Sequence, residues 1–438
     1  MSAAWLLSRS HEVTLFEKEP RFGGHSNTVD ATEPGGTVAI DTGFIVYNTG
    51  CYPNLIALFD YLGVPTATTD MSFSVSLDNG RYEYNGNGAA GFFAQSSNLL
   101  SPTHWRMARD VMRFFREAAL LQSDADDPNL TLGTWLTARG YSRAFIERHI
   151  VPMGAAIWSA PAAEMLGFPA QSFARFFANH GLLQMTNRPE WRTVVGGSRG
   201  YVSRLLAQFR GTAIQDDGVT AISRTASGVS IRTRSGSVAH FDRCLIACHA
   251  DEALGLLSDP SPEERTGLGA FRYAENDTIL HTDARLMPRR RKVWTSWNYL
   301  GSSSDGAERG ACVTYWMNQL QPLPTQQNYF VSLNPAMLPA ADKILARFAY
   351  AHPLFDRNAL AAQKHLWSLQ GQNNTWFAGS YFAYGFHEDA LQSGLAAAED
   401  LGAVRRPWQV EGESSRLTLS ARRLMAKAPA PGLLVAPL

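Results

Sequence analysis

The 438-residue sequence has few cysteines, few lysines and no long hydrophobic run. Its four cysteines are too few for a disulfide framework in a chain of this length. No run of about 18 apolar residues occurs, which argues against a membrane-spanning helix. The first residues also lack the basic segment and cleavage site of a secretion signal. These absences predict a reduced, cytoplasmic protein.

Neither charge sign is in excess, because 39 basic residues balance 39 acidic ones. A nucleic-acid partner is therefore not expected, since nothing would neutralise the phosphates. Hydrophobic residues make up 45% of the chain and charged residues 18%, which excludes a disordered chain. Cys244 and Cys248 are followed by His249, but their segment is typical of a buried strand and no second pair lies nearby. We therefore expect no metal site.

Hydrophobic periodicity predicts alternating strands and helices, and hence an α/β fold. Helices are expected near 2–8, 53–62, 103–122, 131–138, 142–149, 172–183, 201–209, 340–348 and 388–401. Strands are expected near 13–16, 37–46, 219–223, 229–233, 243–248, 293–299, 311–317 and 374–379. A hairpin at 73–84 would turn at Asp78-Asn79-Gly80.

The first motif of chemical interest is a strand that ends at Glu17 and is followed by Arg21-Phe22-Gly23-Gly24-His25. It resembles the flavin-containing amine oxidase superfamily, which includes phytoene desaturases and protoporphyrinogen oxidases. That family has an acid, a short spacer, Arg-x-Gly-Gly and then Arg, which His25 replaces here. The resemblance implies that Glu17 binds the ribose of FAD, and that Gly23, Gly24 and His25 lie beside its pyrophosphate.

A second motif, at 375–394, resembles the C-terminal flavin motif of the same superfamily. There a strand ends in Phe-Ala-Gly-acid, and a loop opens a helix whose N-terminus suits a flavin edge that turns anionic on reduction. The resemblance assigns cofactor contacts to Gly379, Ser380, His387, Glu388, Asp389 and Ala390. His387 and Tyr384 are the candidate catalytic groups beside the flavin.

Asp41-Thr42-Gly43-Phe44 resembles the glycine-containing strand that runs along the isoalloxazine ring, which implies cofactor contacts for Asp41 and Gly43. A Gly-Gly turn at 196–200 leads to a helix and to Val219, the candidate for a backbone contact with adenine. These segments, with 152–159 and 384–389, resemble one branch of predicted NAD(P)- or FAD-binding proteins. Its members accompany enzymes of lipid metabolism, such as cyclopropane fatty acid synthases.

The resemblance implies a Rossmann-like FAD-binding domain interleaved with an α+β substrate domain of mixed sheet and helices. The expected FAD-binding segments are 1–60, 190–250 and 365–402, the substrate segments are 61–189 and 251–364, and 403–438 forms a C-terminal tail. The sequence begins inside the helix that G-x-G-x-x-G would open. We therefore expect a start site assigned too late or a truncated gene, with weakened FAD binding.

The implied activity is that of an FAD-dependent oxidoreductase. A true amine oxidase of this fold would use a lysine near the flavin, but Lys18, Lys292, Lys343, Lys364 and Lys427 all lie in unconvincing surroundings, so amine oxidation is disfavoured. Aromatic residues gather where the family places its substrate: Trp294, Trp297, Tyr299, Tyr315, Trp316, Tyr381, Phe382 and Tyr384. They predict hydride transfer with a hydrophobic, fatty-acyl or isoprenoid-like substrate.

Two other functions stay open. Gly196-x-Ser198-x-Gly200 matches the nucleophile elbow of α/β-hydrolases, so Ser198 with His365 or His387 could form an esterase site. A non-catalytic flavoprotein remnant, truncated at its N-terminus, is the other alternative. Arg289–Arg291 and the segment 405–408 suggest a peripheral membrane contact. The oligomeric state is left open.

Overall fold

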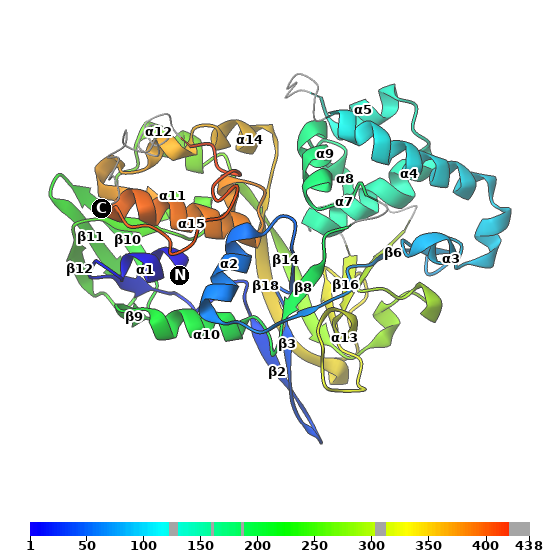
Figure 1. Ribbon diagram of the computed structural model, residues 1–438, viewed down its shortest axis with the longest axis horizontal. Coiled ribbons are helices and arrows are strands. Elements are labelled where there is room, and N and C mark those ends of the chain that lie inside the picture. The colour runs from blue at the N-terminus through cyan, green and yellow to red at the C-terminus, as the bar shows by residue number, and fades with distance from the viewer. Residues whose placement is uncertain (122–129, 159–161, 185–187, 303–311, 420–438) are drawn as a thin grey trace, which may run out of the picture. The chain divides into compact units, whose positions relative to one another are not determined.

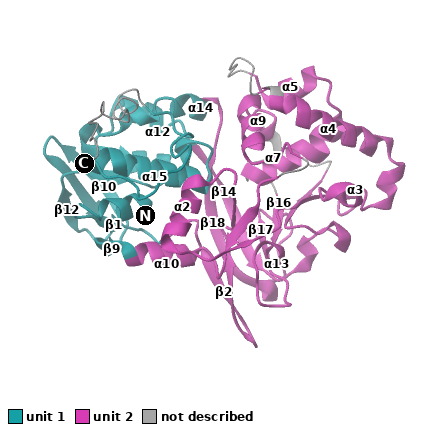
Figure 2. Cartoon of the chain, in the orientation of Figure 1, with its two compact units in different colours: residues 1–22, 208–271, 358–438 teal, residues 23–207, 272–357 magenta. Residues whose placement is uncertain are grey.

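The computed structural model describes residues 1–121, 130–158, 162–184, 188–302 and 312–419. Figure 2 shows two compact units, each assembled from separate stretches of the chain. Unit 1 contains residues 1–22, 208–271 and 358–438, and unit 2 contains residues 23–207 and 272–357. Strands and helices alternate along the chain, so the α/β prediction is confirmed.

The strands of unit 1 form small separate sheets. β1 (Thr14–Phe16) pairs in parallel with β9 (Thr212–Ile214), and β13 (Cys244–Ile246) pairs in parallel with β19 (Thr375–Phe377). An antiparallel sheet contains β10 (Val219–Thr225), β11 (Gly228–Thr233) and β12 (Val238–Phe241). Among the described residues, no strand joins the two parallel pairs.

Helices α1 and α15 pack together in the core of unit 1 (Figure 1). A Cβ on Gly394 of α15 would lie 2.7 Å from the Ser2 hydroxyl, so the missing side chain permits this close approach. The helices of this unit are α1 (Ser2–Leu7), α11 (Ala250–Leu256), α12 (Pro262–Leu268), α14 (Arg357–Gln363) and α15 (His387–Gly402). Short 3₁₀ turns span Leu366–Leu369, Gln372–Asn374 and Ser380–Phe382.

A seven-stranded mixed sheet is the centre of unit 2. Its order is β18 (Ile344–Leu354), β14 (Arg272–His281), β17 (Phe330–Leu333), β16 (Cys312–Trp316), β15 (Trp297–Gly301), β6 (Phe73–Leu77) and β7 (Tyr82–Asn85). Only β15 and β6 are parallel within it. The predicted hairpin is confirmed, with positive φ at residues 78–80.

The remaining strands of unit 2 are β2 (Thr28–Glu33) paired with β3 (Gly36–Asp41), and β4 (Val46–Asn48) and β5 (Thr66–Thr68) on either side of β8 (Trp191–Val194). Its helices are α2 (Pro53–Leu62), α3 (Gly88–Phe92), α4 (Pro102–Leu121), α5 (Leu132–Ala138), α6 (Arg143–Phe145), α7 (Val151–Trp158), α8 (Ala162–Met165), α9 (Ala170–Asn179), α10 (Arg199–Gln208) and α13 (Met317–Leu320). A π-helical turn spans Ile146–Ile150, and 3₁₀ turns span Ser96–Leu100, Ala284–Leu286, Arg291–Val293 and Ala341–Lys343. Phe114, Phe145 and Phe173 fill the core between the helices.

The predicted helix at 340–348 is wrong, because this segment enters the long strand β18. Its exposure alternates residue by residue from Ile344 to Ala349, as in a strand. Pairing with β14 from Arg272 to His281 supplies backbone hydrogen bonds along its length, and this tertiary pairing outweighs the local helix propensity. The predicted strand at 293–299 starts only at Trp297, because Arg291–Val293 forms a 3₁₀ turn.

The two units divide the chain differently from the predicted domains. Residues 23–60 and 190–207, expected in the FAD-binding domain, cluster with unit 2. The reason is local pairing: β4 pairs with β8, which in turn pairs with β5, so these segments are tied to one another inside unit 2. Assigning the FAD-binding domain to particular segments remains a prediction.

Candidate functional site

The carboxyl end of β1 in unit 1 carries the predicted ribose-binding acid. The Glu17 N–H donates to the Ile214 carbonyl at 2.8 Å, which continues the β1–β9 pairing to this residue. Gly218 lies against the loop after β1, since a Cβ there would lie 2.7 Å from Lys18 Cβ. The structure therefore brings Glu17 and Val219, the predicted ribose and adenine contacts, into one part of unit 1.

Arg21, four residues after Glu17, provides a test of whether this unit fits FAD. Its Nη1 is buried and forms no hydrogen bond with any residue that the structure describes. A buried guanidinium nitrogen without an acceptor is costly, so this position favours an anionic oxygen from outside the chain. The residues at this end of β1 thus fit the pyrophosphate of a dinucleotide.

The second part of unit 1 begins where β19 ends, at Gly379. A Cβ here would lie 2.3 Å from the Tyr381 ring, so only glycine fits. The Ser393 hydroxyl accepts from the Gly379 N–H and also lies 3.0 Å from its carbonyl, which ties the strand end to α15. The Ser380 hydroxyl forms no hydrogen bond within the described structure and stays available to a cofactor oxygen.

Asp389 shapes the loop that opens α15. Its carboxylate accepts hydrogen bonds from the N–H groups of Tyr384 and Phe386, at 3.1 and 2.8 Å, and from Arg416 Nη1 at 2.7 Å. Burial raises the pKa of Asp389, and Arg416 opposes this rise. The geometry favours a positioning role for Asp389 over the direct cofactor contact predicted from the sequence.

The other predicted contacts of this loop lie in the first turn of α15. Burial lowers the pKa of His387 to about 4, so its imidazole is neutral at pH 7 and supplies no charge. Glu388 is fully buried and accepts a hydrogen bond from Gln392. Ala390 is half-buried in the same turn. The partial positive charge at this end of α15 therefore comes from backbone N–H groups.

Arg416 was missed by the sequence analysis, which treated 403–438 as a weakly patterned tail. Its guanidinium reaches Asp389 and lies 5.8 Å from the Tyr384 ring. No local motif marks it, because its partners are about 30 residues earlier and only folding brings them together. Tyr384, the other candidate catalytic group, is half-buried beside it.

In unit 2, the Gly23-Gly24-His25 loop packs against the segment that contains Gly43. The Phe44 N–H donates to the His25 carbonyl at 2.7 Å, and a Cβ on Gly43 would lie 2.2 Å from that oxygen. The His25 ring lies 4.9 Å from the Tyr350 ring, measured between centroids. Gly43 is thus required for the backbone position of the predicted pyrophosphate loop.

Asp41 is buried in unit 2 and clamps the Gly196-Gly197 turn. Its carboxylate accepts from the Ser198 N–H at 2.9 Å and hydroxyl at 2.8 Å, and also from Thr28 and Gln321. Burial raises the pKa of Asp41 to about 6. With these donors around it, Asp41 holds the turn in place, and direct cofactor contact is not what this geometry favours.

The esterase alternative based on Ser198 is contradicted by the same contacts. Ser198 is 1% exposed, and its hydroxyl donates to a carboxylate, with Thr28 as a second neighbour at 3.5 Å. An activated serine needs a general base such as histidine within hydrogen-bond reach and an open approach for substrate. Neither holds for Ser198 in the described structure.

The large sheet of unit 2 has one polar face and one apolar face. The polar face carries a buried ladder across adjacent strands, in which Ser74 donates to Asn298, and the Thr314 and Ser332 hydroxyls lie 2.7 Å apart. The opposite face is aromatic and aliphatic: Val75, Leu77, Trp297, Tyr299, Val313, Tyr315 and Val331. The Trp297 and Tyr315 rings meet edge to face at 5.2 Å. The Trp297 indole nitrogen is buried and forms no hydrogen bond with the described residues.

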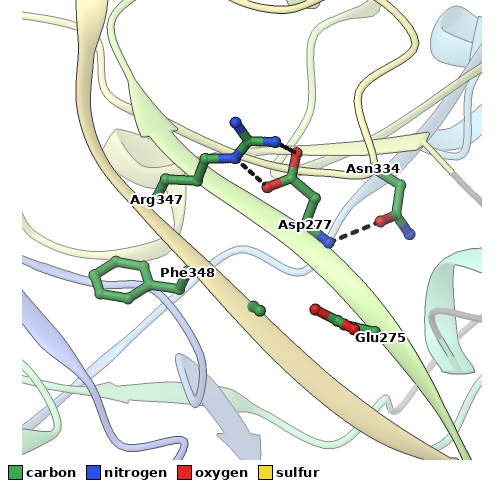
Figure 3. Close-up of a pocket in the computed structure, with 6 residues that line it drawn as sticks. Glu275, Asp277, Asn334, Arg347 and Phe348 are labelled. Atoms are coloured by element: carbon green, nitrogen blue, oxygen red, sulfur yellow. Dashed lines mark hydrogen bonds and ion pairs between the residues drawn. The ribbon is translucent and has the colours of Figure 1, made fainter.

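Another feature of unit 2 is a hollow over β14 and β18 (Figure 3). Arg347 and Asp277 in its wall form an ion pair, with Nε 2.6 Å from Oδ1, and Asn334 accepts from the Asp277 N–H. Glu275 and Phe348 complete the labelled lining. Because the cation is already paired and the wall is polar, this hollow does not suit a hydrophobic substrate.

The described lysines all reach the surface. Lys18 pairs with Glu252, Lys343 lies 3.9 Å from Asp283, and Lys292 and Lys364 are exposed. Lys427 lies outside the described residues. In the part of the chain that the structure covers, no lysine occupies the buried position that amine oxidation would need, nor does any group of side chains suit a metal. Within the same residues, no helix is long and apolar enough to cross a bilayer.

Comparison with known proteins identifies the family. The model of the family described as flavin containing amine oxidoreductase matches residues 1–319. Similar solved structures include a CLA-producing fatty acid isomerase from P. acnes, at 13% identity and a TM-score of 0.63, covering 92% of this chain and 95% of that one. Putrescine oxidase bound to putrescine has 15% identity and a TM-score of 0.65, and covers 92% of this chain and 96% of that one.

A putative protoporphyrinogen oxidase from Exiguobacterium sp. has 14% identity and a TM-score of 0.62, and covers 92% of this chain and 96% of that one. A search of curated sequences gives no match. The solved structures support the fold, and the family model spans most of the chain. Together with the dinucleotide-compatible geometry of unit 1, they show that this chain belongs to the flavin-containing amine oxidoreductase family and is an FAD-dependent oxidoreductase.

Proposed function

We propose that the protein transfers a hydride between FAD and a hydrophobic, fatty-acyl or isoprenoid-like substrate, and that it acts in lipid metabolism. The observation that carries the proposal is the apolar face of the unit 2 sheet, where Trp297, Tyr299 and Tyr315 lie on adjacent strands. None of the residues on this face between β6 and β17 is charged. Most of this face is buried, with Tyr299 and Tyr315 only 9% and 8% exposed, so in this proposal an alkyl or polyene chain reaches it at the half-buried Trp297. There it would bind through dispersion and burial of apolar surface.

Two further observations support a hydrophobic substrate over an amine. A protonated amine needs carboxylates or an aromatic cage around its charge. The Trp297–Tyr315 face instead offers an edge-to-face pair, and strands β6, β15, β16 and β17 contain no charged residue. The described lysines lie at the surface, so none of them is placed to activate water near the flavin as amine oxidation would require. One similar structure is a fatty acid isomerase, whose printed description names a lipid substrate.

In this proposal FAD, when bound, supplies the hydride acceptor. In this proposal the sheet face of unit 2 would bind the substrate and exclude water from it. The backbone N–H groups at the start of α15 in unit 1 would hold the cofactor, with His387 as a neutral imidazole in the same turn. Tyr384 and His387 are proposed as the polar groups nearest the reacting atoms. The Trp297 indole N–H is proposed to find its acceptor in the bound substrate.

The test is anaerobic reduction of the flavin by candidate substrates. Purified protein is loaded with FAD and titrated with oleate, geranylgeraniol or putrescine, and loss of visible flavin absorbance is followed. We expect bleaching by a lipid and none by putrescine. The proposal fails if only the amine bleaches the flavin. Protein that stays colourless after FAD is added would favour the non-catalytic alternative.

Trp297 provides the matched variant. Trp297→Phe should slow bleaching by the lipid roughly tenfold or more, because it removes the indole N–H and part of the apolar contact area. The control is Trp316→Phe, since Trp316 belongs to the opposite face of the same sheet and packs against Arg291. Equal losses in both variants would mean that the apolar face is not the substrate wall.

A further inference from the structure

The helix α4 presents an unusual exposed surface in unit 2. Trp105, Arg109, Met112 and Arg116 follow one another at helical spacing, three or four residues apart, so they form a single stripe. All four are exposed, with Trp105 at 52% and Met112 at 45%, while His104 and Phe114 on the opposite side of α4 are buried. The outward stripe thus alternates apolar and basic side chains.

The turn that precedes α4 extends this surface. Leu99 and Leu100 in the 3₁₀ turn Ser96–Leu100 are 52% and 88% exposed, which makes Leu100 the most exposed large apolar residue described. Trp105 is fixed beside them, because its indole N–H donates to the Leu99 carbonyl at 2.9 Å and its ring lies 4.6 Å from the Phe93 ring. The apolar side chains therefore form a pre-ordered patch and not scattered single residues.

Among the residues that the structure describes, the exposed charged side chains of this patch all carry positive charge. Arg106, Arg109 and Arg116 are exposed, and none of them makes an ion pair with any residue that the structure describes. The sequence from Tyr84 to Arg109 contains no acidic residue. Asp110 is buried and accepts from the Ser142 N–H, so its charge does not face outward. The chain as a whole has zero net charge, whereas this surface carries a local excess of positive charge.

The geometry points to this surface, the α4 patch, as a docking site for an anionic lipid bilayer. Trp and Leu side chains insert at the boundary between headgroups and acyl chains, while arginines bind the lipid phosphates. Exposed apolar residues bordered by cations suit a membrane better than an acidic protein, which would leave Leu99 and Leu100 without apolar partners. The proposal requires no particular substrate, so its test is independent of the test of the proposed function.

The two regions that the sequence suggested for membrane contact are already occupied. Arg406 is buried and pairs with Glu399, and Trp408 stacks on Trp5 at 6.0 Å. Arg290 pairs with Glu83, and Arg291 lies 3.8 Å from the centre of the Trp294 ring. These side chains form ion pairs or ring contacts within their own units, whereas Arg106, Arg109 and Arg116 of the α4 patch form no ion pair with any described residue.

Co-sedimentation with lipid vesicles tests the inference. The FAD-loaded full chain is mixed with vesicles of equimolar phosphatidylglycerol and phosphatidylcholine, or of phosphatidylcholine alone. We expect sedimentation with the anionic vesicles, weakened by salt, and little with the neutral ones. L99S/L100S and R106Q/R109Q/R116Q should each lower the partition coefficient by at least about tenfold.

Matched controls are M337S/L338S and R210Q/R232Q/R265Q, which change exposed residues outside the patch and should bind as the wild type does. Unchanged flavin content and circular dichroism would show that all variants fold. The inference is overturned if the wild type does not sediment or if patch and control variants bind alike. Two other outcomes would also overturn it, if vesicle binding is absent. One is patch-dependent retention of the protein on immobilised polyglutamate, and the other is a patch-dependent dimer whose population rises with concentration in sedimentation velocity.

Discussion

At the scale of single residues, Asp41 links the stability of the protein to pH. Burial raises its pKa from 3.8 to about 6, so the folded state binds this proton more tightly than the unfolded state does. The unfolding free energy should therefore fall as pH rises through this window, by on the order of 3 kcal/mol in all. Asp41→Asn removes this titration. The unfolding free energy of the wild type minus that of the variant should therefore decrease as pH increases.

Urea unfolding at a series of pH values measures this effect, because the contributions of other groups cancel between the two proteins. The wild-type advantage should be largest below pH 3.8 and should have declined to a constant above about pH 6. A difference that stays constant across the whole range would show that Asp41 titrates normally and that the clamp on Ser198 compensates for its burial.

Gly43 is the residue where backbone approach is closest. Gly43→Ala would place a methyl group 2.2 Å from the His25 carbonyl oxygen, so the predicted pyrophosphate loop must move. We expect a loss of roughly 2 kcal/mol or more in unfolding free energy, together with weaker FAD binding in a flavin fluorescence titration. The control is Gly200→Ala, which meets nothing within 4 Å and lies in α10.

Gly200→Ala should be neutral or stabilising by up to about 1 kcal/mol, because alanine favours the helix more than glycine does. Comparable losses in the two variants would point to a general sensitivity of unit 2 and not to the contact between Gly43 and His25.

At the scale of elements, the start of α15 depends on a residue far along the chain. Arg416→Gln would leave the buried Asp389 carboxylate without its cation, and the loop at 384–386 would lose its fixed acceptor. We expect the unfolding free energy to fall by about 3 kcal/mol and FAD affinity to fall as well. Urea unfolding and flavin titration measure the two effects.

Arg405→Gln is the matched control, because Arg405 is 48% exposed in its ion pairs with Glu399 and Glu413, and Glu399 keeps its pair with Arg406 when Arg405 is changed. Because Arg405 is half exposed and Glu399 keeps a cation, the unfolding free energy should fall by only about 1 kcal/mol, less than in Arg416→Gln. The double variant D389N/R416Q should lose less than the sum of its single variants, since removing both charges leaves none unpaired. Strict additivity would contradict direct coupling between Asp389 and Arg416.

The elements also show where local patterns suffice. Residues 53–62 carry a helical stripe that ends at Gly63, and α2 forms over these residues with Gly63 in the left-handed region. The turn at Asp78-Asn79-Gly80 closes the predicted hairpin for the same local reason. β18 fails this kind of prediction, because its conformation is set by pairing with β14 about 70 residues earlier.

At the scale of the whole molecule, the order of segments along the chain does not follow the units. Unit 1 combines three stretches of sequence, so the β1 end, with Glu17 and Arg21, and the α15 loop, with Asp389, join one unit across more than 350 residues. Charge shows the same effect: a chain with no net charge gathers unpaired arginines on α4. Neither feature is visible in composition.

The sequence by itself determined the family, the cofactor and most elements, because these depend on short motifs and on local periodicity. Glu17, Gly23-Gly24 and the 375–394 segment carry that information in their residue types and spacing. The tertiary structure alone decided that Ser198 is a buried donor to Asp41 and that Arg416 fixes the α15 loop. It also decided that Arg106, Arg109 and Arg116 of α4 form no ion pair with any described residue, whereas Arg406 pairs with Glu399. These facts depend on which distant groups meet, and on which charges lose contact with water, and no local pattern encodes either.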